Sequence, residues 1–299
     1  MQARETGETP RIVLITPVRN EAATLERTIA SVAAQTLRPT RWIIVDDGSK
    51  DQTPTILDIA RRAHSWIQVV RREDRGIRSV GKGVIEAFYD GLDAVEVEYD
   101  FVGKLDGDLE FSASYLEHLM AYFRADPQLA AASGTVFCER KGELVEEFSM
   151  IDEMVAGCFK LYRKDAFDRI GGFVRAVMWD GIDFHRARMC GFRTRNLADP
   201  ELRIVHLRQM GSSHRGILRG RLRWGEGQWF MGSSFVYVIA SGLNRMRERP
   251  FVVGGLLIIA GYLRGALLRR PRYEDLEFRR ELRRWQSARL SNLLGPGRS

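Results

Sequence analysis

The chain of 299 residues is 44% apolar and 28% charged, a composition typical of a globular protein with a buried core. Its three cysteines are widely separated and form no CxxC pair, which argues against a disulfide framework or a structural zinc site. The first residues are polar and contain no secretory signal, so we expect a reducing, cytoplasmic environment. The net charge of +7 is uneven, because residues 1–200 carry a net charge of −5 and residues 201–299 one of +12.

Strands and helices are predicted to alternate after a disordered tail over residues 1–10. Apolar runs predict strands at 11–18, 41–45, 66–70, 99–105, 130–137, 156–163 and 201–206. Helical spacing predicts helices near 22–34, 53–63, 82–93, 114–124, 164–172 and 180–191. This order predicts an α/β fold, with an open, mostly parallel sheet flanked by helices and a Rossmann-like nucleotide-binding half.

Polar clusters follow three of the predicted strands. They occupy residues 19–21, 46–49 and 106–108, each directly after an apolar run. In open parallel sheets, ligands bind beyond the carboxyl ends of the strands, where strand order reverses. We therefore expect these clusters to meet at one edge of the sheet.

The cluster at 106–108 places two carboxylates one residue apart. Asp-Gly is a common turn dipeptide, so Asp106-Gly107-Asp108 could be no more than a turn. However, Asp106 and Asp108 can also present oxygens to one divalent cation, which would neutralise their repulsion. Mg²⁺ or Mn²⁺ is the predicted cofactor.

Two further features indicate a nucleotide. Asp47 follows a buried strand beside a second carboxylate, a position from which it can accept hydrogen bonds from a base or ribose. GIRSVGKG at 76–83 lacks the Ser or Thr that a P-loop needs after its Lys. Arg78 and Lys82 of this segment nevertheless remain candidates for contacts with phosphates.

Four segments, in this order, resemble the successive motifs of family 2 glycosyltransferases: TPVRNEA (16–22), VDDGSKD (45–51), LDGD (105–108) and WDGID…R…G (179–191). The resemblance covers about residues 11–215 and implies a GT-A fold. It also implies inverting transfer of a sugar from a nucleotide-diphospho-sugar donor.

The resemblance assigns roles to individual positions. Pro17, Arg19 and Glu21 match the loop that lines the nucleoside pocket, and Asp47 matches the carboxylate that holds the base or ribose. Asp106 and Asp108 match the D-x-D pair that serves donor and metal.

Later segments supply weaker matches. Asp180 matches the general base, although the family's preceding Glu is Trp179 here and the second Asp appears one residue late, which leaves Asp183 as an alternative. His206 is similar to a His that can meet the metal or the diphosphate, and a structural role is its alternative. Arg223 and Trp224 resemble part of a signature of processive synthases near the acceptor or diphosphate, with a membrane-facing pair as the alternative.

Residues 216–299 form the predicted C-terminal region, which is rich in Arg, apolar and helical. Two apolar stretches, 229–243 and 251–263, are shorter than a spanning helix and are flanked by Arg residues. This pattern suits an amphipathic hairpin on an anionic cytoplasmic membrane surface, while a pair of ordinary core helices is the alternative.

The predicted enzyme acts in polysaccharide, glycolipid or cell-envelope biosynthesis, with a lipid-linked or saccharide acceptor. We expect no nucleic-acid partner, because the Arg residues are interleaved with apolar stretches. The alternatives are a non-catalytic protein that binds membrane or nucleic acid, and a nucleotidyltransferase. The donor sugar, the acceptor and the oligomeric state cannot be predicted from the sequence.

Overall fold

A computed structural model describes residues 9–74, 76, 81–140, 142–147, 152–208, 216–247 and 250–294. The chain divides into two compact units, which we describe separately. The first unit comprises residues 1–176 and 190–209, and the second comprises residues 177–189 and 210–299. The helix predicted near 180–191 thus groups with the C-terminal helices, although it lies within the stretch assigned to the first domain.

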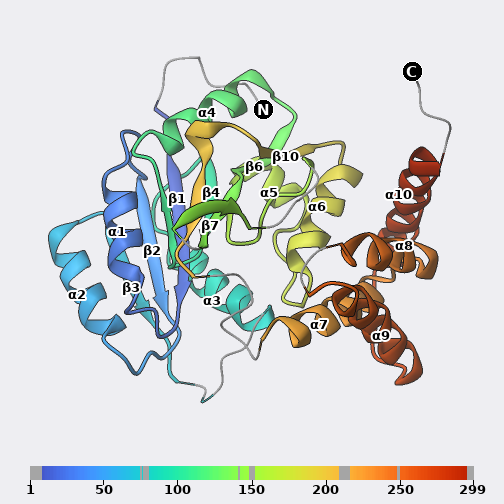
Figure 1. Cartoon of the computed structure of the whole chain (residues 1–299). Coiled ribbons are helices and arrows are strands. Elements are labelled where there is room, and N and C mark those ends of the chain that lie inside the picture. The colour runs from blue at the N-terminus through green and yellow to red at the C-terminus, as the bar shows by residue number, and fades with distance from the viewer. Residues whose placement is uncertain are drawn as a thin grey trace. The chain divides into compact units, whose positions relative to one another are not determined.

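The first unit contains a seven-stranded sheet in the order β10-β6-β9-β4-β1-β2-β3. All neighbouring strands are parallel except that β9 runs antiparallel to β4 and β6. This confirms the predicted mostly parallel sheet (Figure 1). The strands are β1 (Ile12–Val18), β2 (Arg41–Asp46), β3 (Ile67–Arg71), β4 (Phe101–Leu105), β6 (Leu129–Gly134), β9 (Phe159–Arg163) and β10 (Arg193–Leu197).

Helices cover both faces of this sheet (Figure 1). Ile12 and Leu14 of β1 belong to a core that also contains Leu25 of α1. On the opposite face, α3 packs so closely that a Cβ on Gly91 would lie 2.7 Å from Ile15 Cγ2. The helices of this unit are α1 (Leu25–Ala33), α2 (Thr53–Ala63), α3 (Lys82–Asp93), α4 (Tyr115–Ala125), α5 (Lys164–Arg169) and the 3-10 helix η1 (Pro200–Leu202).

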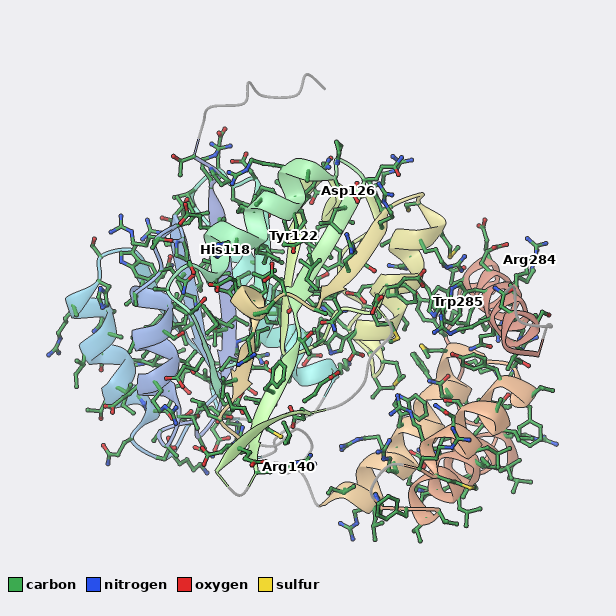
Figure 2. The ribbon with its side chains drawn as sticks, turned by 45° about the horizontal axis from the view of Figure 1, so that its top comes forward. His118, Tyr122, Asp126, Arg140, Arg284 and Trp285 are labelled. Carbon is green, nitrogen blue, oxygen red and sulfur yellow. The ribbon has the colours of Figure 1, made fainter. Side chains whose placement is uncertain are left out.

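Side-chain hydrogen bonds and ion pairs tie α4 to later segments of the first unit. Tyr122, which Figure 2 labels on α4, donates to the carboxylate of Asp199 just before η1 at 2.8 Å. Asp126 at the end of the same helix pairs with Arg193 of β10 at 2.7 Å. These contacts hold β10 and the segment that follows it against α4.

A second, four-stranded sheet has the order β5-β11-β7-β8. Its strands are β5 (Leu109–Phe111), β7 (Val136–Arg140), β8 (Glu143–Glu146) and β11 (Ile204–His206). The single strand predicted at 130–137 is wrong, because β6 and β7 belong to different sheets. The chain changes sheet at Gly134, where a Cβ would lie 1.5 Å from the carbonyl oxygen of Leu202.

The second unit is helical, with α6 (Trp179–Met189), α7 (Ile217–Met231), α8 (Phe235–Arg245), α9 (Val253–Leu267) and α10 (Leu276–Leu294). The predicted stretch 229–243 is not one helix, because Gly232 adopts φ 82° and ends α7. Glycines allow α7 and α9 to pack with their backbones in contact. A Cβ on Gly225 would lie 2.0 Å from the carbonyl oxygen of Ile258. Among the described residues, no helix has the length and hydropathy needed to span a bilayer.

Candidate active site

The predicted acidic clusters lie at the carboxyl ends of three adjacent parallel strands, β2, β1 and β4. Val18 at the end of β1 is in register with Asp46, and the Asp47 N–H donates to the Val18 carbonyl oxygen at 2.9 Å. The Asp106 N–H donates to the carbonyl oxygen of Cys158 at 2.8 Å. The sheet therefore brings the three clusters to one edge, which we call the acidic rim (residues 19–21, 46–47 and 106–108).

The turn at 106–108 lies directly against the loop that follows β1. A Cβ on Gly107 would lie 2.7 Å from Val18 Cγ1, so a glycine allows this close approach. The Thr24 hydroxyl donates to the Gly107 carbonyl oxygen at 3.3 Å, and the Leu109 N–H donates to the Thr28 hydroxyl at 3.1 Å. These contacts fix both ends of the acidic turn.

Asp106 has a partner in its own strand. Lys104 is 3% exposed in β4, and its ammonium group pairs with the Asp106 carboxylate. The same ammonium donates to the carbonyl oxygen of Gly157 at 2.7 Å. Asp106 is thus held by a buried cation next to the strand end.

Asp108 faces a different set of groups. Its Oδ2 lies 3.4 Å from His206 Nε2 and 3.0 Å from Nη2 of Arg208. The strand β11 supplies His206 because it pairs with β5, with His206 opposite Leu109. The structure therefore brings His206 to Asp108, as the resemblance implied, across almost 100 residues of sequence.

Sequence reasoning missed two residues of this cluster. Glu147 lies just after β8, and its Oε2 is 2.7 Å from Nδ1 of His206. Arg208 lies two residues beyond β11 and also pairs with Glu21 at 2.9 Å. The only signal in the sequence was their charge, since both positions depend on contacts made through the second sheet.

His206 lies between two buried carboxylates. Burial alone would lower its pKa, but the hydrogen bonds to Asp108 and Glu147 raise the pKa of His206 to about 10. Burial would likewise raise the pKa of Asp108, but His206 and Arg208 more than offset this effect and lower it. In this state the cluster is an ionised network of an imidazolium, a guanidinium and carboxylates.

The Asp47 side of the acidic rim carries a separate ionic network. Asp47 pairs with Arg72 at 2.7 Å, and Arg19 donates to the Asp47 carbonyl oxygen. Arg19 also pairs with Asp74 at 2.6 Å. Pro17 lies within β1 beside this network.

The two candidates for contacts with phosphates differ in what the structure shows. Lys82 is the first residue of α3 and lies 3.5 Å from Glu86. Arg78 lies outside the described residues.

The remaining candidates belong to the second unit. Asp180 lies in the first turn of α6 and is half-buried, whereas Asp183 is 1% exposed and accepts a hydrogen bond from the Phe184 N–H at 2.6 Å. Arg223 and Trp224 lie on α7, and the guanidinium of Arg245 stacks over the Trp224 ring at 5.0 Å. Their predicted roles stay predictions.

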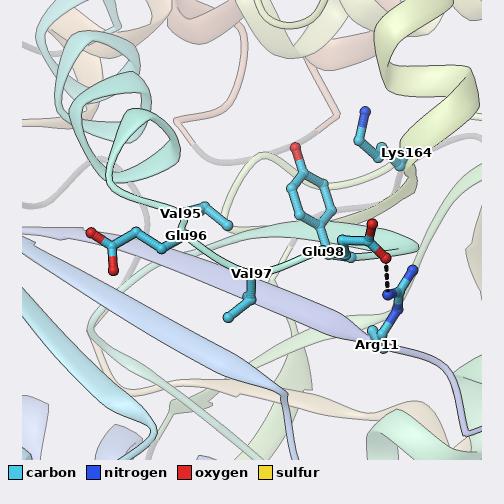
Figure 3. Close-up of a pocket in the computed structure, with 7 residues that line it drawn as sticks. Arg11, Val95, Glu96, Val97, Glu98 and Lys164 are labelled. Atoms are coloured by element: carbon cyan, nitrogen blue, oxygen red, sulfur yellow. Dashed lines mark hydrogen bonds and ion pairs between the residues drawn. The ribbon is translucent and has the colours of Figure 1, made fainter.

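A depression of about 560 Å³ lies at the opposite end of the sheet (Figure 3). Arg11, which directly precedes β1, lines it and pairs with Glu98 at 2.6 Å. Ligands of open parallel sheets bind at the carboxyl ends of the strands. We therefore place the candidate active site at the acidic rim and not at this depression.

The chemistry of the Asp108 cluster fits a divalent cation. Asp108 Oδ2 and His206 Nε2 face each other, and oxygen and neutral imidazole nitrogen are both ligands of such cations. A cation that binds here would therefore displace the proton from His206 Nε2. Glu147 on the far ring nitrogen would orient the imidazole. Within the described ranges, no group of three or more His, Cys, Asp or Glu residues could hold a metal. A cation here would therefore take its other ligands from water and donor phosphates.

Comparisons with known proteins agree with this fold. Residues 13–147 match the family model described as Glycosyl transferase family 2. A poly-beta-1,6-N-acetyl-D-glucosamine synthase of Staphylococcus aureus (strain COL) is 22% identical over 228 residues, which are 70% of this chain and 52% of that synthase. The chain thus spans about half the length of the curated relatives that it matches.

Solved structures share the fold at low sequence identity. A mannosyltransferase from Pyrobaculum calidifontis in complex with GDP-Man and Mn²⁺ has a TM-score of 0.55 and 17% identity, over 95% of this chain and 81% of that one. Residues 1–349 of S. aureus TarS in complex with UDP have a TM-score of 0.52 and 14% identity, over 95% and 79% of the two chains. These likenesses show the GT-A fold.

Proposed function

We propose that this protein, whose residues 13–147 belong to glycosyl transferase family 2, is an inverting glycosyltransferase that uses a nucleotide-diphospho-sugar. The observation that carries the proposal is the Asp108 cluster, in which a carboxylate from the turn after β4 meets an imidazole from β11 of the second sheet. Buried ion pairs contribute little net stability, because desolvation of the charges offsets their attraction. Their convergence supports a site for a cation and a diphosphate.

The donor would lie along the acidic rim. Asp47 would receive hydrogen bonds from the base or ribose, next to Pro17, Arg19 and Asp106. Asp108 and His206 would hold Mg²⁺ or Mn²⁺, which would offset the charge that develops on the leaving diphosphate. The mannosyltransferase named above carries GDP-Man and Mn²⁺, which supports this class of donor and cofactor.

Asp180 is the proposed general base, which would take the proton of the acceptor hydroxyl as that oxygen attacks the anomeric carbon. One displacement without a covalent intermediate inverts the anomeric configuration. Asp180 is half-buried, whereas Asp183 is buried and accepts a backbone hydrogen bond. This difference supports Asp180 over Asp183, because a base must reach its substrate.

The exposed apolar side chains of the second unit support a membrane location for the acceptor. Val253, Leu256, Leu263 and Leu267 of α9 are 41–83% exposed and recur at helical spacing. Arg residues follow at 269 and 270, and both are exposed. Such a surface suits anionic lipid on the cytoplasmic face of the cell membrane. We therefore propose a lipid-linked or saccharide acceptor in the biosynthesis of polysaccharide, glycolipid or cell envelope, with Arg223 and Trp224 near it.

The enzyme proposal is tested by donor hydrolysis and binding. Purified protein is incubated with a panel of UDP- and GDP-sugars and Mn²⁺, and the released nucleotide and the rise in melting temperature are measured. For a donor that gives a signal in both assays, the rise in the protein's melting temperature should disappear when EDTA removes the cation. It should also disappear in the Asp108→Asn variant. The matched control is Asp165→Asn, since Asp165 forms an ion pair with the nearby Arg163 on another part of the first unit. Failure of every nucleotide-sugar in both assays would refute the proposal.

The membrane proposal is tested by sedimentation with vesicles that contain phosphatidylglycerol. Wild-type protein should sediment with anionic vesicles and less with neutral ones, whereas Leu256→Asp with Leu263→Asp should stay in solution. Ile59→Asp is the control, because Ile59 is 60% exposed but lies on α2 of the first unit. Equal sedimentation of the α9 variant and the control would contradict the proposal.

A further inference from the structure

Arg208 bridges two loops of the acidic rim. Its Nη2 donates to Oε1 of Glu21 at 2.9 Å and to Oδ2 of Asp108 at 3.0 Å. Glu21 follows β1 and Asp108 follows β4, so one guanidinium nitrogen joins the ends of two adjacent strands. No motif of the sequence drew attention to this residue.

The bridge uses the same carboxylate oxygen that would serve a divalent cation. Asp108 Oδ2 lies 3.4 Å from His206 Nε2 and also accepts from Arg208. A divalent cation on this oxygen would compete with the guanidinium for it and would be repelled by its charge. In the state that the structure describes, Arg208 and the His206 imidazolium together supply the positive charge that these carboxylates need.

Of the three partners, Arg208 is the most exposed to solvent. Its side chain is 32% exposed, whereas those of Glu21 and Asp108 are 6% and 7% exposed. The carboxylates are held in the interior, while the guanidinium reaches them from the surface. An Arg that leaves a carboxylate pair is well suited to a diphosphate, since its planar fork matches phosphate oxygens.

We infer that Arg208 is a resident cation of the donor-free site, which yields Asp108 to the divalent cation and transfers its guanidinium to the donor diphosphate. The second half of this inference rests on the proposed function. As a positioning residue, Arg208 couples the binding of the cation to that of the diphosphate. Either ligand alone has to break the ion pair between Arg208 and Asp108, whereas the two together give both residues a new partner. Free Mn²⁺ should therefore bind weakly to the protein without nucleotide.

The test separates these two effects in one variant. Arg208→Gln removes the competing charge, so Mn²⁺ alone, titrated by electron paramagnetic resonance, should bind about tenfold tighter than to wild type, a difference of about 1.4 kcal/mol. The same variant should bind UDP or GDP with saturating Mn²⁺ about tenfold more weakly, because the diphosphate loses its Arg. A merely structural Arg would not produce opposite signs.

Arg203→Gln is the matched control, since this Arg stacks over the Phe137 ring at 4.8 Å in the same unit and touches none of these carboxylates. It should match wild type in both titrations. Arg208→Ala also removes the charge, and it should bind Mn²⁺ alone about tenfold tighter than wild type, which provides a second variant if Arg208→Gln does not fold. Unchanged Mn²⁺ affinity in the folded variants would overturn the inference.

Failure of the proposed function would look different. If wild-type protein bound neither UDP nor GDP with Mn²⁺, the donor proposal would fail while the titration with Mn²⁺ alone would still decide whether Arg208 competes with the cation.

Discussion

His185 makes the stability of the second unit depend on pH. It lies on α6, 5% exposed, with its ring 4.9 Å from that of Trp285 and 6.0 Å from that of Phe278 on α10 (Figure 2 labels Trp285). Its Nδ1 has no hydrogen-bond partner among the described residues. Burial, with a smaller effect of Arg188, lowers the pKa of His185 from 6.5 to about 3.

The sign and size of the effect follow from proton linkage. Between about pH 6.5 and 3 the unfolded chain binds a proton at this residue and the folded chain does not, so the free energy of unfolding falls as the pH falls. From about pH 7.5 to about pH 5 this single site lowers the free energy of unfolding by about 2 kcal/mol. The free energy lost at low pH is that of the contact between α10 and α6, the helix that carries Asp180.

Urea denaturation at these two pH values, followed by tryptophan fluorescence, measures the loss. His185→Phe removes the titrating group and keeps an aromatic ring, so its stability should fall with pH by about 2 kcal/mol less than that of wild type. His64→Phe removes a histidine from the first unit and should keep the wild-type dependence. An identical pH dependence in His185→Phe and wild type would refute the assignment of a buried neutral imidazole.

Three further changes test the packing and the chemistry. Gly107→Ala should weaken donor binding and lower the free energy of unfolding by about 1–3 kcal/mol, because its Cβ would press on Val18, whereas Gly220→Ala, with open space around its Cβ, should be neutral in urea denaturation. Gly261→Val should lower the melting temperature of the second unit, since a Cβ there would lie 2.1 Å from the Leu222 carbonyl oxygen. Asp180→Asn should retain donor binding in thermal-shift assays but lose transfer, and near-normal turnover would exclude Asp180 as the base.

The sheet and its acidic rim were predictable because their signals are local. An apolar β-branched run such as that of β1 suits a strand that is buried on both faces, and the polar residues that follow must then lie at its carboxyl end. The turn at 106–108 was predictable for the same reason. Glycine at 107 could not be explained from the sequence, because the side chain that excludes a Cβ belongs to Val18, on a neighbouring strand.

The second sheet was not predicted, for a physical reason. Its strand β5 has three residues, too few to show a periodicity. The strand β11 lies within the stretch predicted at 201–206, but its pairing with β5 and β7 in a separate sheet has no signal in the sequence. The stretch 130–137 looks continuous in the sequence because both of its halves are apolar. The change of sheet depends on the approach of Leu202 at Gly134, a contact about 70 residues away in sequence.

The short strand β11 explains why the charges of the site escaped sequence reasoning. Carboxylates that await a cation repel one another in its absence, and a folded protein has to offset that repulsion. Here each acidic group has a basic neighbour that the fold supplies: Lys104 for Asp106, and His206 with Arg208 for Asp108. A basic residue that neutralises such a site has no fixed spacing from the acid, because only their distance in space matters. Asp106, Asp108 and His206 could therefore be predicted from the motifs that they resemble. Their partners Lys104, Glu147 and Arg208 are found only in the structure.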